Sequence, residues 1–514
     1  MAKPTGQSQY TTPQVSLGSK TLGGGLNSTA GNLQLEDNES SKLQNIDFDK
    51  FGSILKRNGY TALNTSAIAS SPASDGLFWH EWNASGTQTR KLMNVAGGKF
   101  WKMDDLDGTW DDITGALTIT SGNHCDFESF LNECYVTNGY DVPFKWTGTG
   151  NGSAMTVPSS LTKAKYVKQF NNYLFLANVY VGTTYYPSRF YWSNLKDTGT
   201  WLSTSWIEIA KDDGQEITGI KVLSDRLVVF KGRSIYNVFF TGDADIPFTV
   251  SKSNSPVGCV APFSIQEVDN GLVFLAPDGI YYYDGNNSYK ISVRIQTTLD
   301  SFNQTKMNTV VSSVYRKKNL VYFAFCSSSA TTHDRVIVWN YFLNSFSVYS
   351  GMAIAGMAQV FPDGMEERPY FADYSGFAYR MDTGENDYPL NVKTAIDSYY
   401  YTNWKTYDDL VSKKGIVQCN IFYTISNSVV TFVYAYDFED ADQFSLSLNL
   451  STSTSTYGSA IYGTARYAGA GGAVQRKDVT GRGRAVRFGF KNNTIDESFK
   501  IDGFGTWLQL ETNV

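Results

Sequence analysis

Short runs of alternating apolar and polar residues, separated by turns rich in glycine, recur between residues 75 and 390. Each unit reads as a strand, a tight turn and a second strand with aromatic residues at alternate positions, a pattern typical of a β-hairpin. Seven such units occur, at residues 92–103; 134–140 with 144–146; 173–177 with 189–192; 226–238; 272–283; 320–325 with 335–339; and 370–379.

The spacing of these hairpins is even. Leu92, Cys134, Leu174, Leu227, Leu272, Leu320 and Tyr370 mark equivalent points and follow one another at intervals of 40 to 53 residues. A four-stranded propeller blade takes about 40–50 residues. The pattern therefore predicts an all-β fold with a β-propeller of about seven degenerate blades. Six or eight blades stay open, as does a large sandwich of unrelated hairpins.

The segments on either side of the hairpins differ from them. Residues 1–60 are rich in Gly, Ser, Asn and Gln with only intermittent apolar residues, so we expect an extended N-terminal arm on a neighbour or a covering layer of the next domain. Residues 61–390 form the predicted propeller. Longer alternating runs in residues 391–514 predict a small C-terminal β-sandwich or jelly roll, with a long polar loop at residues 451–472 as a contact site.

The composition supports this interpretation and limits the function. Only 18% of the 514 residues are charged, whereas 33 Tyr and 32 Phe accompany many β-branched residues, as strands require. Residues 61–390 contain 25 Lys and Arg against 32 Asp and Glu, and the flanking segments are nearly balanced. A protein that grips DNA neutralises phosphates with excess basic residues. We expect the short basic clusters at 316–318 and 482–484 to be solvated turns.

Few residues are available for metal or cofactor chemistry. The five cysteines (Cys125, Cys134, Cys259, Cys326 and Cys419) form no C-x-x-C pair, and the histidines (His80, His124 and His333) are scattered without ligand spacing. We expect the cysteines to be buried apolar residues, and we predict no metal and no cofactor. The amino terminus lacks the apolar core of a secretory signal and no run of about 18 apolar residues occurs, so we expect a protein made in a cytoplasm and not embedded in a membrane by itself.

Enzymatic motifs are similarly sparse. A glycosidase needs two carboxylates about 5 to 10 Å apart, and the richest supply is Asp104, Asp105, Asp107, Asp111 and Asp112, which we interpret as exposed turn residues. Residues 105–110 and 194–201 resemble the turn-stabilising Asp-box of sialidase-like propellers without its leading Ser or Thr. No G-x-S-x-G, Walker-type loop or H-E-x-x-H occurs, and we predict neither catalytic residues nor an enzyme.

Residues 22–60 carry a recognisable succession of motifs: Leu22-Gly-Gly-Gly-Leu-Asn27, Leu35-Glu-Asp-Asn-Glu39, Leu43-Gln-Asn-Ile-Asp47 and Gly52-Ser-Ile-Leu-Lys-Arg-Asn-Gly-Tyr60. This opening resembles that of the tail hub or nozzle proteins of short-tailed bacteriophages, also labelled DNA-stabilisation or tail tubular proteins. Residues 190–201 are similar to a middle stretch of their propeller and residues 483–490 to their terminal sandwich. The resemblance marks five family-match positions as expected subunit contacts: Gly24, Asn27, Asn45, Arg57 and Gly59.

The resemblance implies a virion protein that assembles as a ring, commonly a hexamer, below the portal and adaptor proteins. Such a ring would continue the DNA channel, retain packaged DNA as passing cargo and dock fibres, spikes or a plug. The expected location is the virion tail, assembled in the host cytoplasm. A low surface charge with abundant Tyr, Ser, Asn and Gly suits wet subunit interfaces related by rotational symmetry. The alternatives are a carbohydrate-binding, receptor-recognising propeller and a glycan hydrolase.

Overall fold

A computed structural model describes residues 14–16, 22–84, 86–158, 160–364, 366–451 and 472–510. The chain divides into two compact units. Unit 1 comprises Met1–Asn58, Trp339–Tyr349 and Thr394–Val514, and unit 2 comprises Gly59–Val338 and Ser350–Lys393. The division of the chain at residues 60 and 390 stays a prediction.

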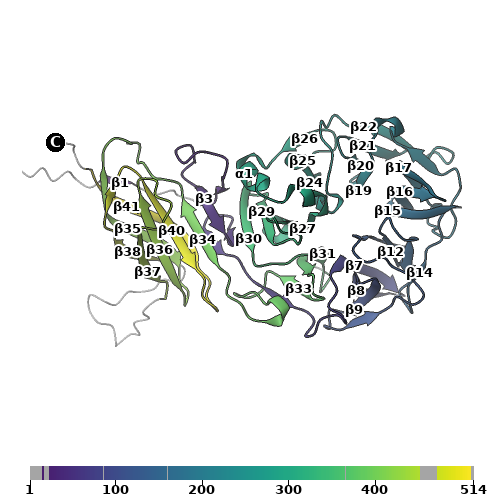
Figure 1. The fold of residues 1–514 in the computed structure, drawn as a ribbon, viewed down its shortest axis with the longest axis horizontal. Helices are drawn as coiled ribbons and strands as arrows, with labels where there is room; N and C mark the ends of the chain where they lie inside the picture. The colour runs from purple at the N-terminus through teal and green to yellow at the C-terminus, as the bar shows by residue number, and fades with distance from the viewer. Residues whose placement is uncertain are drawn as a thin grey trace, which may run out of the picture. The chain divides into compact units, whose positions relative to one another are not determined.

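Seven four-stranded sheets follow one another along the described part of the chain, and Figure 1 shows them arranged around a common centre. The first four consist of β7 (Ser74–Ala84), β8 (Thr87–Ala96), β9 (Lys99–Asp104) and β10 (Trp110–Asp112); β11 (Asp126–Phe130), β12 (Glu133–Thr137), β13 (Phe144–Trp146) and β14 (Ser153–Ala154); β15 (Leu161–Phe170), β16 (Tyr173–Val181), β17 (Thr184–Trp192) and β18 (Trp206–Glu208); and β19 (Ile217–Leu223), β20 (Arg226–Lys231), β21 (Ile235–Phe240) and β22 (Phe248–Lys252).

The last three sheets complete the ring. They consist of β23 (Gln266–Val268), β24 (Gly271–Ala276), β25 (Gly279–Tyr283) and β26 (Ser288–Lys290); β27 (Val311–Tyr315), β28 (Leu320–Phe325), β29 (Arg335–Asn340) and β30 (Ser345–Ser350); and β31 (Gly356–Val360), β32 (Arg368–Ala372) and β33 (Ala378–Met381) with β6 (Tyr60–Ala62). This arrangement confirms the predicted propeller and its seven blades.

The predicted hairpins are the middle two strands of the seven blades. The first is β8 with β9, where Ala96 pairs with Lys99 across Gly97 and Gly98. Both glycines have positive φ angles, 61° and 73°, as a two-residue turn between twisted strands requires. The even spacing of the hairpins along the sequence therefore corresponds to the length of one blade.

The blades are held together by apolar cores between neighbouring sheets. Between the fourth and fifth blades, Phe230 and Phe274 lie 5.1 Å apart by ring centroids, in a buried cluster that also contains Val228, Ile235 and Leu272. Middle strands are covered on both faces, and every residue of β24 is buried. Strands covered on both faces read as continuous apolar runs. This explains why the middle strands were the part of each blade most visible in the sequence.

One strand of the propeller comes from far away in the sequence. The outer strand of the seventh blade is β6, in which Tyr60 pairs with Met381 and Ala62 with Tyr379 of β33. The propeller therefore closes by joining its first strand to its last blade. Its helices are short: η1 (Lys211–Asp213), η2 (Pro262–Ser264), η3 (Val293–Ile295), α1 (Gln296–Asp300), η4 (Gln304–Thr309), η5 (Arg316–Lys318) and η6 (Pro389–Asn391).

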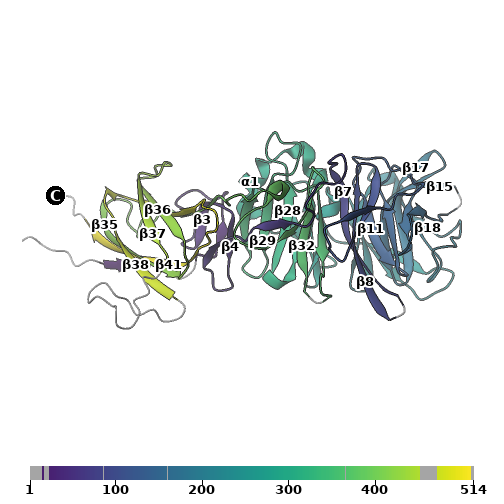
Figure 2. The same ribbon diagram turned by 90° about the horizontal axis from the view of Figure 1, so that it is seen from below.

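Unit 1 contains two larger sheets (Figures 1 and 2). One runs in the order β38 (Gly472–Asp478), β35 (Lys414–Thr424), β41 (Lys500–Leu510), β5 (Ile54–Lys56) and β4 (Ile46–Phe48), with β1 (Gln14–Ser16) on β41 and β39 (Arg482–Gly483) on β35. The other runs in the order β2 (Gly25–Leu26), β3 (Glu39–Gln44), β34 (Ser398–Thr402), β40 (Val486–Asn492), β36 (Val429–Tyr436) and β37 (Phe444–Asn449).

These two sheets pack face to face. The rings of Phe488 and Phe490 from β40 lie 5.2 and 6.4 Å from the ring of Phe504 on β41, and all three side chains are buried. This is the core of a β-sandwich, as predicted for the C-terminal residues. The structure differs from the sequence-based expectation in one respect, since β2 to β5 of the N-terminal segment are strands of these same sheets. The predicted loop at 451–472 lies outside the described residues except for its two ends.

Candidate functional site in the axis of the propeller

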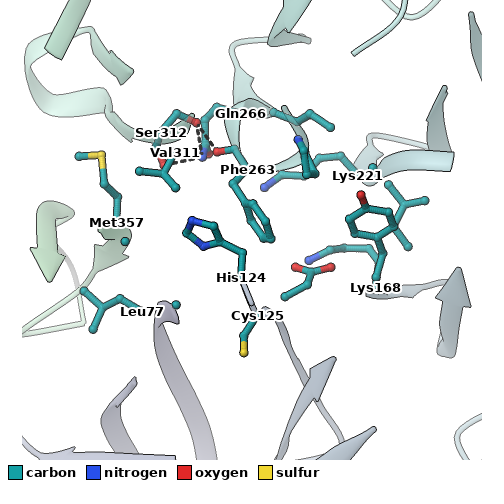
Figure 3. Close-up of a pocket in the computed structure, with 18 residues that line it drawn as sticks. Leu77, His124, Cys125, Lys168, Lys221, Phe263, Gln266, Val311, Ser312 and Met357 are labelled. Carbon is teal, nitrogen blue, oxygen red and sulfur yellow. Dashed lines mark hydrogen bonds between the residues drawn. The ribbon is translucent and has the colours of Figure 1, made fainter. Parts of the chain in front are cut away.

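The innermost strand of every blade faces the axis of the propeller. These strands line a cavity of about 130 Å³, shown in Figure 3, through Gly76, Asp126, Lys168, Lys221, Gln266, Ser312 and Met357, one from each blade. A second, wider cavity of about 470 Å³ shares Lys168, Lys221, Gln266, Ser312 and Met357 with the first. The two cavities together form an axial channel with charged residues where they meet.

The charges where the two cavities meet come from three consecutive blades, the second, third and fourth. Glu128 of β11 forms an ion pair with Lys168 of β15, and Asp126 Oδ2 accepts a hydrogen bond of 3.0 Å from the Val167 backbone N–H. Burial raises the pKa of Asp126 to about 6. Burial, followed by repulsion from Lys168, lowers the pKa of Lys221 to about 8. Both pKa shifts show that burial removes hydration from these two groups and that their neighbours do not fully replace it.

His124 and Cys125 also line the axial cavity. The His124 ring lies 4.9 Å from the Phe263 ring by centroids, as Figure 3 shows, and burial lowers its pKa to about 4. Burial raises the pKa of the Cys125 thiol well above its usual range. Near neutral pH the imidazole is uncharged and the thiol is protonated. These two residues therefore lack the thiolate and imidazolium that a cysteine nucleophile uses.

The aspartates that could supply glycan hydrolysis are engaged with lysines. Asp104 pairs with Lys102 at 2.7 Å and with Lys91 at 3.2 Å, and Asp111 pairs with the same Lys102 at 2.7 Å. Desolvation acts to raise the pKa of Asp104, but the two lysines outweigh it and lower that pKa. The general acid of a glycosidase needs a raised pKa. The lysines hold Asp104 in the opposite state, so it is a poor general acid.

Of the five aspartates expected in turns, only Asp105 and Asp107 lie in one, whereas Asp104, Asp111 and Asp112 lie in β9 and β10. Asp112 pairs with Lys99 at 2.6 Å, Asp107 Oδ1 accepts a hydrogen bond from the Thr109 backbone N–H at 2.9 Å, and Asp105 occupies a turn with a φ angle of 47°. In the second Asp-box-like segment, Asp197 Oδ1 accepts a hydrogen bond from the Gly199 backbone N–H at 2.8 Å. Both segments act as local turn stabilisers.

The basic cluster at 316–318 is paired with carboxylates. Arg316 contacts Glu367 at 2.8 Å, Lys317 forms an ion pair with Glu366, and Lys318 forms one with Asp382. Cations neutralised by carboxylates of their own chain have little charge to offer to phosphates. This cluster is therefore a poor candidate for a DNA-binding patch.

The family-match residues of unit 1 make contacts inside the chain. The Gly24 backbone N–H donates to the Asn38 carbonyl at 3.0 Å, and Asn27 Nδ2 donates to the buried Glu39 at 2.9 Å. Asn45 and Arg57 are both buried, with Arg57 Nε donating to Asn45 Oδ1 at 2.8 Å. These contacts fix the path of the chain between β2 and β5.

Gly59, the fifth family-match residue, lies in unit 2. A Cβ at this position would lie 1.7 Å from the Asn386 carbonyl oxygen, and the Gly59 N–H donates to the Gly384 carbonyl at 3.0 Å. Only glycine fits where the two backbones approach so closely. A role of these five residues in contacts between subunits stays a prediction.

Sequence patterns did not reveal the axial residues Asp126, Tyr166, Lys168 and Lys221. All four lie on strands that precede the recurring hairpins, where polar side chains interrupt the apolar pattern. The sequence did contain a usable signal, because charged residues at equivalent positions of consecutive blades face a common axis. Among the described residues, no group of three or more metal-ligating side chains comes together. None of the helices in the described part of the chain has the length and hydrophobicity to span a membrane.

Comparison with known proteins identifies the propeller. Residues 69–324 match the family model described as bacteriophage P22 Gp10, β-propeller. The propeller belongs to this phage tail hub family. The matched residues run from the segment before the first blade into the sixth, so the family model covers the first five blades and part of the sixth. The resemblance to phage tail hub proteins is thereby confirmed, and the chain is a phage structural tail protein with a propeller fold.

Other comparisons add little. No curated protein matches the chain. Among solved structures, the computationally designed Ika8 protein is 12% identical, with 63% of this chain and 99% of that chain covered and a TM-score of 0.37. A chain of the mitotic checkpoint complex is 9% identical, with 64% and 94% covered and a TM-score of 0.38. YCF48 bound to D1 peptide is 12% identical, with 66% and 98% covered and a TM-score of 0.38. Likenesses this weak carry no inference about function.

Proposed function

We propose that this protein forms the tail hub or nozzle ring of a short-tailed phage, below the portal and adaptor proteins. The ring continues the DNA channel, retains packaged DNA and docks fibres, spikes or a plug. The observation that carries this proposal is the match of residues 69–324 to the phage P22 Gp10 propeller family. The role is structural and not enzymatic. The ring consists of copies of this chain, commonly six, and assembles in the host cytoplasm before it becomes part of the virion tail.

The size of the axial channel supports a particular DNA path. The two axial cavities have volumes of only about 130 and 470 Å³. The major groove of B-DNA alone is about 12 Å wide. A duplex therefore does not fit the axis of one propeller. In our proposal the DNA passes through the opening enclosed by several subunits.

The charge distribution supports passage without gripping. Acidic residues outnumber basic ones in the propeller segment, with 32 Asp and Glu against 25 Lys and Arg over residues 61–390. The basic cluster at 316–318 is already paired with Glu367, Glu366 and Asp382. A channel that released few counterions on contact with DNA would hold it weakly at any salt concentration. Such a surface would let DNA leave quickly once the tail opens.

Electron microscopy of the purified full chain mixed with the portal and adaptor proteins tests the ring. We expect closed rings attached to the adaptor, with the chain present in purified virions. A chain that stays monomeric with these partners and is absent from virions would contradict the proposal. Binding of that monomer to a glycan array would then favour receptor recognition.

DNA retention has its own test. Virions assembled without this protein should package DNA and then lose it, and supplying the intact chain should restore nuclease-resistant DNA. As a control, heads blocked before packaging contain no DNA in either case. Heads that keep their DNA without the chain would refute the retention role and leave the ring to be judged by microscopy.

A further inference from the structure

The junction of the two axial cavities contains two lysines that lie close together. Lys168 of β15 and Lys221 of β19 come from the innermost strands of adjacent blades and line both cavities. Figure 3 shows both side chains reaching toward the axis. Their mutual repulsion contributes to the lowered pKa of Lys221. Two ammonium groups thus share one partly enclosed space.

Only one of these lysines has a close carboxylate partner. Lys168 forms an ion pair with Glu128, whereas within the described residues the Lys221 amine has neither a hydrogen bond nor an ion pair. The groups that act on Lys221 from the surrounding strands are Lys168, Glu128, Asp126 and Glu267. Of these, Asp126 already accepts the Val167 backbone N–H at 3.0 Å. A desolvated cation without a direct partner is unfavourable unless an anion approaches it.

A third donor is unsatisfied in the same place. The Tyr166 side chain is 2% exposed and lines the narrower cavity, and its hydroxyl has no hydrogen-bond partner among the described residues. Tyr166 and Lys168 are two positions apart on β15, so their side chains point to the same face of the strand. A buried hydroxyl without a partner costs about 1–3 kcal/mol, which indicates that a bound group normally satisfies it.

We propose that the axial cavity binds a small oxyanion, held by the Lys221 ammonium group and by the Tyr166 hydroxyl, beside the Lys168–Glu128 ion pair. The narrow cavity of about 130 Å³ has room for an ion of the size of phosphate or sulfate. The anion would neutralise Lys221 and link the adjacent third and fourth blades. This site is independent of the proposed role in the tail, because it involves only side chains of one propeller.

Isothermal titration of the full chain with inorganic phosphate measures the site directly. The test variants are Lys221→Met, which keeps the aliphatic stem, and Tyr166→Phe, which removes one oxygen. Lys99→Met is the control, because Lys99 is an exposed lysine paired with Asp112. We expect phosphate affinity to fall about tenfold or more in Lys221→Met, about threefold or more in Tyr166→Phe, and not at all in Lys99→Met.

Thermal unfolding with phosphate or chloride at equal ionic strength provides the second measurement. Phosphate stabilises most proteins by exclusion from their surface. The informative quantity is therefore the rise in unfolding temperature that phosphate causes relative to chloride. This rise should be larger in wild type and in Lys99→Met than in Lys221→Met. Without phosphate, Lys221→Met should unfold at a higher temperature than wild type, since it removes a half-buried cation that has no direct partner among the described residues. If Lys221→Met does not fold, the Tyr166→Phe titration decides.

Sulfate, whose charge is constant near neutral pH, reveals the role of the amine. Lys221 is charged below its pKa of about 8, so sulfate affinity should fall as the pH rises through that value. Equal phosphate affinity in wild type and both test variants, or the lack of any binding heat, overturns the proposal. So does a sulfate affinity that does not change as the pH rises through the pKa of Lys221.

Discussion

The propeller and the sandwich are both built of antiparallel strands, but they pair segments at very different distances along the chain. In the propeller, Ala276 of β24 pairs with Gly279 of β25, three positions later. In the sandwich, Ser40 of β3 pairs with Thr402 of β34, and Ile54 of β5 pairs with Ile501 of β41. Local pairs close short loops and non-local pairs close long ones. The difference teaches that hairpin patterns reveal a propeller far better than a sandwich.

The propeller has one non-local pair of its own, because its closing strand β6 comes from the N-terminal side and pairs with β33. Gly59→Ala tests this closure, and we expect the largest loss of stability from this substitution. A methyl group 1.7 Å from the Asn386 carbonyl oxygen forces the backbones apart and should cost about 4 kcal/mol or more of unfolding free energy. Urea unfolding measures the loss, and hydrogen exchange should rise first in β6 and β33.

Gly232→Ala is the matched control, because a Cβ at residue 232 meets no atom within 4 Å. Its stability should stay close to that of wild type. If Gly59→Ala is as stable as this control, closure through β6 contributes little and the propeller is held by its hairpins alone.

The sandwich core should respond separately from the blades. Phe504→Ala removes the ring that packs on Phe488 and Phe490, and should cost about 3–4 kcal/mol. Hydrogen exchange should accelerate in β40 and β41 and stay unchanged in β24 and β25. Phe274→Ala in the propeller is the reciprocal variant and should reverse this pattern. Uniform acceleration in both variants would show that the two folds unfold together.

A smaller loss is expected from the link between the N-terminal strands. Asn45 has a φ angle of 54°, accepts from Arg57 Nε at 2.8 Å and donates to the Asp397 carbonyl at 2.7 Å. Asn45→Ala should cost about 2 kcal/mol, from two lost hydrogen bonds and an unfavourable φ. Asn45→Gly relieves only the φ strain and should recover part of the loss in thermal unfolding. Equal losses in both variants would mean that φ strain plays no part.

The smallest effect should be a gain in stability within the first blade. Burial raises the pKa of Asp75 to about 7, and Asp75 Oδ2 has no hydrogen-bond partner among the described residues. An unfolded aspartate has a pKa near 3.9, so between about pH 4 and pH 7 the native state binds more protons and stability falls as the pH rises. Asp75→Asn should remove this fall and gain about 1 kcal/mol at pH 8. A variant with the wild-type pH dependence would contradict this assignment.

Sequence patterns predicted the blades because each middle strand is buried on both faces and each turn is local. Gly97 and Gly98 identify such a turn without knowledge of any distant residue. The pairing of Ser40 with Thr402 has no such signature, since five of the six residues 39–44 are polar and their partners lie in another region of the chain. The N-terminal strands therefore looked like an arm.

The axial residues could not be predicted for a related reason. Lys168 and Lys221 meet because consecutive blades turn about one axis, and that geometry exists only after the blades are counted and aligned. Position alone also did not reveal the burial of Arg57, whose side chain is 2% exposed despite its charge. Strand periodicity shows on which face of a strand a side chain lies, whereas the residues that it contacts depend on the whole fold.

The pairing of β3 with β34 also delays completion of this sheet while the chain is being synthesised. Ser40 Oγ donates to the Tyr401 carbonyl, 361 residues later in the chain. At about 5–20 residues per second, a ribosome needs roughly 20–70 s to deliver that partner after Ser40 has been made. Throughout this interval the edge of β3 that pairs with β34 and the edge of β5 that pairs with β41 stay open. Cells that produce many copies of this chain at once therefore carry a pool of half-finished sheets, and holding them apart is a task for chaperones.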